Sequence, residues 1–334
     1  MTRVVALGGG HGLHATLSAL RLLHGRGLVD SITAVVTVAD DGGSSGRLRR
    51  ELGLLPPGDL RMAMAALAGE APDPWVTLLQ HRFGGTGALA GHAVGNLLLA
   101  GLMETLGDPV AALDRVGALV GVLGRVLPMS CEALDIEAQV TGLHPDDPMA
   151  VSRIRGQVAV ASTPGRVQRV RLRPDRPRAC LEAVEAVREA DVVVLGPGSW
   201  FTSVLPHLLV PALRDAVLDG SAYRVVVLNL APEPGETAGF SPEQHLAVLS
   251  EHAPGLRLDA VLADVAAVPV PDRLRRAART VLTGDGRIHL APVAAEGTGR
   301  GAAEPRHDPA ALAEALRAVL AELPSARRDA TERS

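Results

Sequence analysis

Two glycine-rich segments, each directly after an apolar run, contain the residue types that bind phosphate. Gly8-Gly9-Gly10-His11-Gly12 follows the first run, and Gly196-Pro197-Gly198-Ser199 follows a later one. Backbone amides at a helix start carry the positive end of the helix dipole and face an anion. We therefore predict a phosphate site at Gly9, Gly10, Gly12, Gly196, Gly198 and Ser199. The first segment is also compatible with a simple strand-to-helix turn, because Leu13 replaces the third glycine of the dinucleotide pattern.

Two adjacent carboxylates open another loop, Asp40-Asp41-Gly42-Gly43-Ser44-Ser45-Gly46. An acid at the end of a second strand can bind a ribose hydroxyl, a divalent cation or a substrate hydroxyl. The alternative is that Asp41-Gly42 is a turn signal, but a turn does not require several further small residues. We assign Asp40, Asp41, Gly42, Gly43, Ser44 and Ser45 to the ligand site.

Polar residues farther along the chain complete the predicted set. Asp59, in Pro56-Pro57-Gly58-Asp59-Leu60-Arg61, is either the N-cap of a helix over 60–67 or a second metal ligand beside Asp40. Arg61 would then reach a phosphate. His92 and Asn96, four residues apart, either line the pocket or are buried polar groups with internal partners. The remaining predicted ligand residues, Thr202 and Asn229, follow later strands.

Apolar runs predict the elements that position these loops. Residues 4–7, 13–23 and 31–39 form one strand–helix–strand unit, and further strands are predicted at 191–195, 223–228 and 258–262. Helices are predicted at 204–218 and 242–252, and 89–123 is mostly helical. Continuous apolar strands are typical of a parallel sheet covered on both faces. The predicted fold class is α/β, a doubly wound, mostly parallel Rossmann-like sheet whose loops converge at the carboxyl ends of its strands.

The pattern of apolar and polar residues changes after residue 133. Residues 134–173 contain short polar-interleaved runs at 134–142, 156–162 and 166–172, which predict a small β-rich insertion. The Rossmann-like nucleotide-binding domain then comprises 1–133 and 174–300. Residues 301–334 are predicted to hold a helix at 309–323 and a disordered tail at 325–334.

Composition excludes several functions. The net charge of -4 and the 2% aromatic content argue against nucleic-acid binding. Every basic side chain is Arg, so a Walker-type lysine, a Schiff-base lysine and a lysine general base are impossible. Cys131 and Cys180 lack disulfide-framework or zinc spacing and are predicted to be buried apolar residues. The longest apolar stretch, 97–106, contains Glu104 and is too short to span a membrane, and no signal peptide precedes residue 4, which predicts a cytoplasmic protein.

A family resemblance follows from the ordered motifs GGGHGL, VADDGGSSGRLR, PPGDLR, GHAVGN, GPGSWFTSVLPHLLV and NLAPEPGET. Over residues 4–252 the chain resembles the bacterial gluconeogenesis-factor family, which looks like a branch of the 2-phospho-L-lactate transferase superfamily. The resemblance implies a role in cell shape and wall synthesis during gluconeogenic growth. It implies a UDP-sugar ligand such as UDP-N-acetylglucosamine, no required cofactor and no catalytic residue. The transferase relatives imply Mg²⁺ at Asp40 and Asp59, although PPGDLR has one acid fewer than their segment.

Three functions remain open at this point. The first is a nucleotide-sugar-binding regulatory protein. The second is a metal-dependent transferase that moves a phospho-group from a nucleoside diphosphate donor to an acceptor hydroxyl. The third is an NAD-dependent oxidoreductase, against which Leu13 counts. A homo-oligomer and protein partners in wall synthesis are compatible with the first function.

Overall fold

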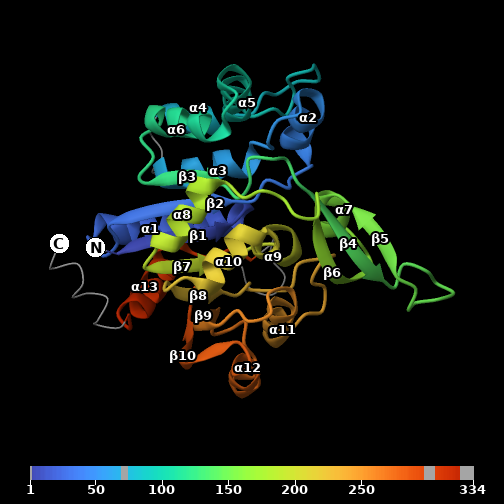
Figure 1. The fold of residues 1–334 in the computed structure, drawn as a ribbon, viewed down its shortest axis with the longest axis vertical. Coiled ribbons are helices and arrows are strands. Elements are labelled where there is room, and N and C mark those ends of the chain that lie inside the picture. The colour runs from blue at the N-terminus through green and yellow to red at the C-terminus, as the bar shows by residue number, and fades with distance from the viewer. Residues whose placement is uncertain (1, 69–73, 297–304, 324–334) are drawn as a thin grey trace.

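A seven-stranded parallel sheet forms the centre of the computed structural model, which describes residues 2–68, 74–296 and 305–323. In spatial order the strands are β10-β9-β8-β7-β1-β2-β3 (Figure 1). Their bounds are β1 Arg3–Gly8, β2 Ser31–Val36, β3 Arg125–Pro128, β7 Val192–Leu195, β8 Tyr223–Val227, β9 Leu258–Asp264 and β10 Leu282–Ala291. Every pairing between neighbours is parallel. The predicted α/β fold class is confirmed.

Helices cover both faces of this sheet. The chain runs from β1 through β2 to β3 on one side of β1, and from β7 to β10 on the other. Because parallel crossovers are right-handed, the two directions place their helices on opposite faces. Helix α1 (Gly10–Gly25) packs between α3 (Gly58–Ala68) and α13 (Pro309–Leu320), whereas α8 (Leu181–Glu189) packs against α10 (Pro211–Asp219). The central strands β1, β7, β8 and β9 are therefore mostly apolar and buried, whereas the edge strand β10 is partly exposed.

The remaining helices lie at the margins of the sheet. Helices α2, α4, α5 and α6 gather beyond α3, at the top of Figure 1. The bounds not yet given are α2 Gly43–Leu52, α4 Pro74–Gln80, α5 Val94–Leu106, α6 Pro109–Leu119, the π-helix η1 Trp200–Val204, α9 Leu205–Leu209, α11 Pro242–His252 and α12 Pro271–Ala278. Helices α5 and α6 agree with the helical prediction for 89–123, and α11 coincides with the prediction for 242–252.

A second, three-stranded antiparallel sheet lies to one side of the first, in the order β5-β4-β6 (Figure 1). Its strands are β4 Asp135–Thr141, β5 Ser152–Arg155 and β6 Arg166–Arg173, all inside the predicted β-rich stretch. The strand expected at 156–162 is wrong, because this segment forms helix α7, Gln157–Ala161. Gly156 precedes it with φ 102°, and a carboxylate from outside the segment accepts from its amide at Val158. A short apolar run does not reveal such a distant cap.

Several local predictions also need correction. The helix expected over 204–218 is broken into η1, α9 and α10, where Pro206 and Pro211 begin new helices. Strands β3 and β10 were not predicted, because one ends in proline and the other contains two glycines. Cys131 is exposed, contrary to the prediction, while Cys180 is buried.

Helix α13 ends at Leu320, three residues before the predicted end, and the predicted disordered tail at 325–334 lies outside the described residues. Within the described ranges no single helix is long and apolar enough to cross a bilayer. Only the two consecutive helical segments 200–209 and 211–219 are together long and apolar enough, and their axes are bent by 80° at the break between them.

Candidate functional site

A cleft of about 830 Å³ lies where the order of the sheet reverses, between β1 and β7. Open α/β sheets bind their ligands at this topological switch point, at the carboxyl ends of the strands. Segments far apart in the sequence line the cleft, at 9–15, 59–62, 80–82, 157–161, 197–203, 229–236 and 305–309. The structure thus brings Gly9, Gly10, Gly12, Arg61, Gly198, Ser199 and Asn229 of the predicted ligand set to one place, together with Asp59.

The N-terminus of α1 forms one wall of the cleft. Its N-cap, Gly9, is extended and supplies no side-chain cap, and the first turn contains no acid. A Cβ atom on Gly9 would lie 2.5 Å from Cγ2 of Thr37, and one on Gly12 would lie 2.1 Å from the carbonyl oxygen of Pro197. Both positions therefore require glycine, because Thr37 after β2 lies against Gly9 and the loop after β7 lies against Gly12. No side chain of α1 itself caps the helix start, and the positive end of the helix dipole faces the cleft.

Two carboxylates lie beside this helix start. Burial, and then the nearby Asp40, raise the pKa of Asp59 to about 7, against the lowering effect of the Gly10 amide, which donates to it. Burial also raises the pKa of Asp40, which accepts from the amide of Gly42 at 2.9 Å. Two carboxylates that disfavour each other's ionisation form a donor set that a divalent cation stabilises. The residues therefore fit the predicted Mg²⁺ site, although among the described residues no group of three or more His, Cys, Asp or Glu is arranged to hold a metal.

Arg61 connects the cleft to a buried polar network. Its Nε donates to Oδ1 of Asn96 at 2.9 Å, and Nδ2 of Asn96 donates to Oγ of Ser44 at 3.0 Å. Oγ of Ser44 is also 2.9 Å from Nδ1 of His92. Burial lowers the pKa of Arg61 to about 10, which leaves the guanidinium charged near neutral pH. Arg61 is the member that lines the cleft, while His92, Asn96 and Ser44 hold it from behind.

Side chains of the loop after β8 fix the second glycine segment. Asn229 accepts from the amide of Gly198 at 2.9 Å and donates to its carbonyl at 3.0 Å. Glu236 accepts from the amide of Phe201 at 2.8 Å and from the hydroxyl of Thr202 at 3.1 Å. Of the amides expected to hold a phosphate here, that of Gly198 donates to Asn229 and that of Gly196 donates to the carbonyl of Leu7. The segment therefore shapes the cleft wall, and Asn229 and Thr202 act as its supports.

Other predicted residues lie behind the cleft lining. Asp41 accepts from the amide of Val158 at 2.9 Å and so caps α7 of the small sheet. Gly42 and Gly43 begin α2, and Ser45 is hydrogen-bonded to Asp40. Gly196 has φ 73° and accepts from the hydroxyl of Thr16 at 3.0 Å. This group holds the loop after β2 and the elements around it in place.

The sequence did not identify several residues that line the cleft. They include His11, His14, Arg82, Gln157, Ala161, Glu233, Glu236, Arg306 and His307. The polar loop containing Glu236 was noted, but its position against η1 depends on the fold. Arg306 and His307 carry no local motif, because they reach the cleft only after the chain returns from β10 to begin α13.

The fold and this cleft define a Rossmann-like α/β protein with its site at the switch point of a parallel sheet. The sequence model described as "2-phospho-L-lactate transferase CofD" matches residues 4–293. The chain belongs to that family, and to the group within it whose members are named gluconeogenesis factors.

Three relatives illustrate this similarity. A Mycobacterium tuberculosis H37Rv protein named "Putative gluconeogenesis factor" is 58% identical over 320 residues, covering 95% of this chain and 90% of the relative. The "Gluconeogenesis factor" of Halalkalibacterium halodurans is 40% identical over 249 residues, covering 75% of this chain and 73% of the relative. The crystal structure of a UPF0052-family protein from Bacillus halodurans superposes with a TM-score of 0.78 at 34% identity, covering 94% of this chain and 98% of that one.

Proposed function

We propose that the cleft binds a nucleoside diphosphate sugar of the UDP-N-acetylglucosamine class, and that the protein regulates other proteins according to this ligand. The observation that carries the proposal is the pairing, across one cleft, of the N-terminus of α1, which has no acid in its first turn, with the guanidinium of Arg61. Helix amides and a planar guanidinium are the groups that bind a diphosphate. The volume of about 830 Å³ accommodates a ligand of this size.

The charge distribution supports a diphosphate at the centre of the cleft. Arg61, Arg82 and Arg306 all line it and can neutralise an anion. Asp59 lies against the Gly10 amide, and its raised pKa reduces its negative charge near neutral pH, which lowers repulsion of a phosphate. The two ends of the cleft would then hold the nucleoside and the sugar.

The relatives' name and the construction of the cleft wall support a regulatory role, which the proposal places in the cytoplasm. Helix α7 of the small sheet contributes Gln157 and Ala161 to that wall, so a bound ligand would contact an element of the peripheral sheet. The proposal places the protein in the control of cell shape and wall synthesis during gluconeogenic growth, with UDP-N-acetylglucosamine as the signal of precursor supply.

A phospho-group transferase is the second candidate, because Asp40 and Asp59 fit a divalent cation. Bound Mg²⁺ would supply charge neutralisation at the transferring phosphoryl group. In this candidate Arg61 and the amides at 10–12 orient the donor diphosphate, and the loop containing Ser199 excludes water from the cleft.

Calorimetric titration with UDP-N-acetylglucosamine, UDP, GDP and NAD, each with and without Mg²⁺, tests the proposal. We expect binding confined to the UDP compounds and independent of Mg²⁺, and a loss of about tenfold or more in Arg306→Ala, since charged hydrogen bonds contribute 1.5–3 kcal/mol. Arg279→Ala, at an exposed arginine that ends α12 and does not line the cleft, is the matched control. Mg²⁺-dependent preference for GDP would favour the transferase, and NAD binding alone would contradict both candidates.

A further inference from the structure

The small sheet presents a strongly basic outer face, away from the core. Along β4, Ile136, Ala138 and Val140 are buried, while Asp135, Glu137 and Gln139 alternate with them on the outer side. Residues directly opposite in an antiparallel pair share a face. The register therefore puts six arginines on this side, Arg153 and Arg155 of β5 and Arg166, Arg169, Arg171 and Arg173 of β6. We call these residues the arginine face.

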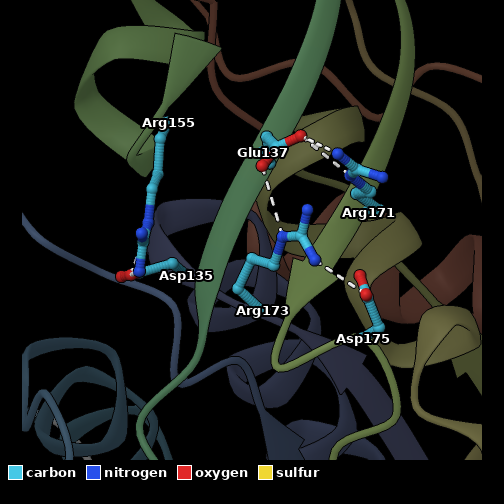
Figure 2. Close-up of polar contacts among 6 residues, drawn as sticks. All are labelled: Asp135, Glu137, Arg155, Arg171, Arg173 and Asp175. Carbon is cyan, nitrogen blue, oxygen red and sulfur yellow. Dashed lines mark hydrogen bonds and ion pairs between the residues drawn. The ribbon is translucent and has the colours of Figure 1, made fainter. Parts of the chain in front are cut away.

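The acids on this face are already paired. Asp135 accepts from Arg155 and from Arg49 of α2. Glu137 accepts from Arg171 at 2.8 Å and from Arg173 at 3.2 Å. Figure 2 shows Arg173 between Glu137 and Asp175. Its Nη1 donates to Oδ2 of Asp175 at 2.7 Å. Neither acid on β4 is left to neutralise another arginine.

Three arginines of the face are exposed and form no ion pair with any described residue, namely Arg153, Arg166 and Arg169. Arg153 and Arg169 flank Gln139 in one cross-strand row. Because neighbouring strands lie about 4.8 Å apart, the backbones of Arg153 and Arg169 are about 10 Å apart on this face. In a chain with a net charge of -4, this concentrates unneutralised positive charge on a small area.

Exposed apolar side chains adjoin the same face. The segment between β4 and β5 projects from the body of the molecule (Figure 1) and carries Met149, which is 80% exposed, and Val151, which is 61% exposed. Arginine and methionine are both enriched in protein–protein interfaces. Exposed apolar side chains next to fixed arginines are therefore typical of a surface that a partner covers.

We propose that the arginine face, with Met149 and Val151, binds an acidic segment of a partner protein. Carboxylates of the partner would pair with Arg153, Arg166 and Arg169, and an apolar side chain would cover Met149. The observations favour a protein over RNA or a membrane. Residues 134–178 contain no Phe, Tyr or Trp for base stacking or for an interfacial anchor. The charge lies on a sheet, and the apolar area is too small to insert into lipid.

Fluorescence anisotropy with a labelled peptide that alternates Glu and Leu tests this surface on the full chain. The triple variant Arg153→Ser/Arg166→Ser/Arg169→Ser should weaken peptide binding by about tenfold or more, as expected for interface arginines. The matched control, Arg273→Ser/Arg276→Ser/Arg279→Ser on exposed positions around α12, removes the same charge and should change affinity by less than about twofold. Met149→Ser should weaken binding without any change of charge.

Four outcomes would overturn the proposal. The first is no saturable binding of the peptide by the unmodified chain. The second is an equal loss in both triple variants, which would show general electrostatic attraction. The third is tighter binding of double-stranded RNA or of phosphatidylglycerol vesicles that is lost in the arginine-face variant alone. The fourth is self-association of the unmodified chain, measured by sedimentation, that the arginine-face variant abolishes, because the occupant would then be a second copy.

Discussion

Glu236 provides the sharpest test of how the cleft wall is held together. It is 2% exposed and accepts from both Phe201 and Thr202 at the start of η1. Burial, and then the negative charge of Glu233, raise its pKa to about 8. Glu236→Gln imitates the protonated side chain, because its amide oxygen can accept from Phe201 and its NH₂ can donate to the hydroxyl of Thr202.

The sign of the pH effect follows from this raised pKa. Between the pKa of the unfolded chain, near 4.5, and about 8, the folded protein holds a proton that the unfolded chain has lost. The stability contributed by that proton is complete below the lower value and is lost as the pH rises through the upper one. A shift of this size corresponds to about 5 kcal/mol at most. Because Glu233 shares the interaction, we expect the pH-dependent contribution of Glu236 to the free energy of unfolding to be ~2 kcal/mol.

The assay is urea unfolding of both proteins at pH 5 and pH 9, followed by the fluorescence of the buried Trp200. We compare the free energy of unfolding of the Gln variant with that of the unmodified chain. This difference should be about 2 kcal/mol more in favour of the variant at pH 9 than at pH 5. Glu185→Gln, an exposed change on α8, is the control and should show no such difference. If the free energy difference between the Glu236 variant and the unmodified chain is the same at both pH values, the reasoning about this carboxyl is wrong.

Three further predictions follow from contacts around the cleft. Gly12→Ala should lower the free energy of unfolding by about 1–3 kcal/mol, because its Cβ would meet the loop after β7 at 2.1 Å, and an unchanged melting temperature would contradict this. Arg61→Met should lower the free energy of unfolding by about 1–3 kcal/mol, since Asn96 loses its donor. It should also weaken nucleotide binding, so urea unfolding and calorimetric titration should both show a loss. Asp41→Ala should lower the free energy of local unfolding of α7 by about 1 kcal/mol, because the Val158 amide loses its acceptor. Hydrogen exchange should accelerate in α7 while the main sheet keeps its protection.

The sequence predicted the cleft better than the individual contacts inside it. Glycines after apolar runs mark strand ends, and parallel strands bring their ends together, so Gly9, Gly12 and Gly198 were assigned from local pattern alone. The same pattern does not say which polar residue touches the ligand. Asn229 and Asp41 follow strands in sequence, yet they bind backbone of neighbouring loops.

The residues that the sequence missed depend on long-range packing. Arg306 reaches the cleft from beyond β10, and Gln157 reaches it from a helix that was predicted as a strand. Both positions are fixed by how separate elements pack, which no short window contains. Thr37 is similar, because its methyl group is recognisable as a neighbour of Gly9 only in the folded chain.

Helix α7 contacts both the small sheet and the cleft. Along the chain it connects β5 to β6 of the sheet that carries the arginine face, it packs against β4 and β5, and its Gln157 and Ala161 line the cleft. If occupancy of the cleft shifts α7, the affinity at the arginine face must change by some factor. Thermodynamic linkage then requires a partner on that face to change the affinity for the nucleotide by the same factor. The five residues of α7 would then act as a reciprocal coupling element, through which a partner adjusts the ligand concentration to which the protein responds.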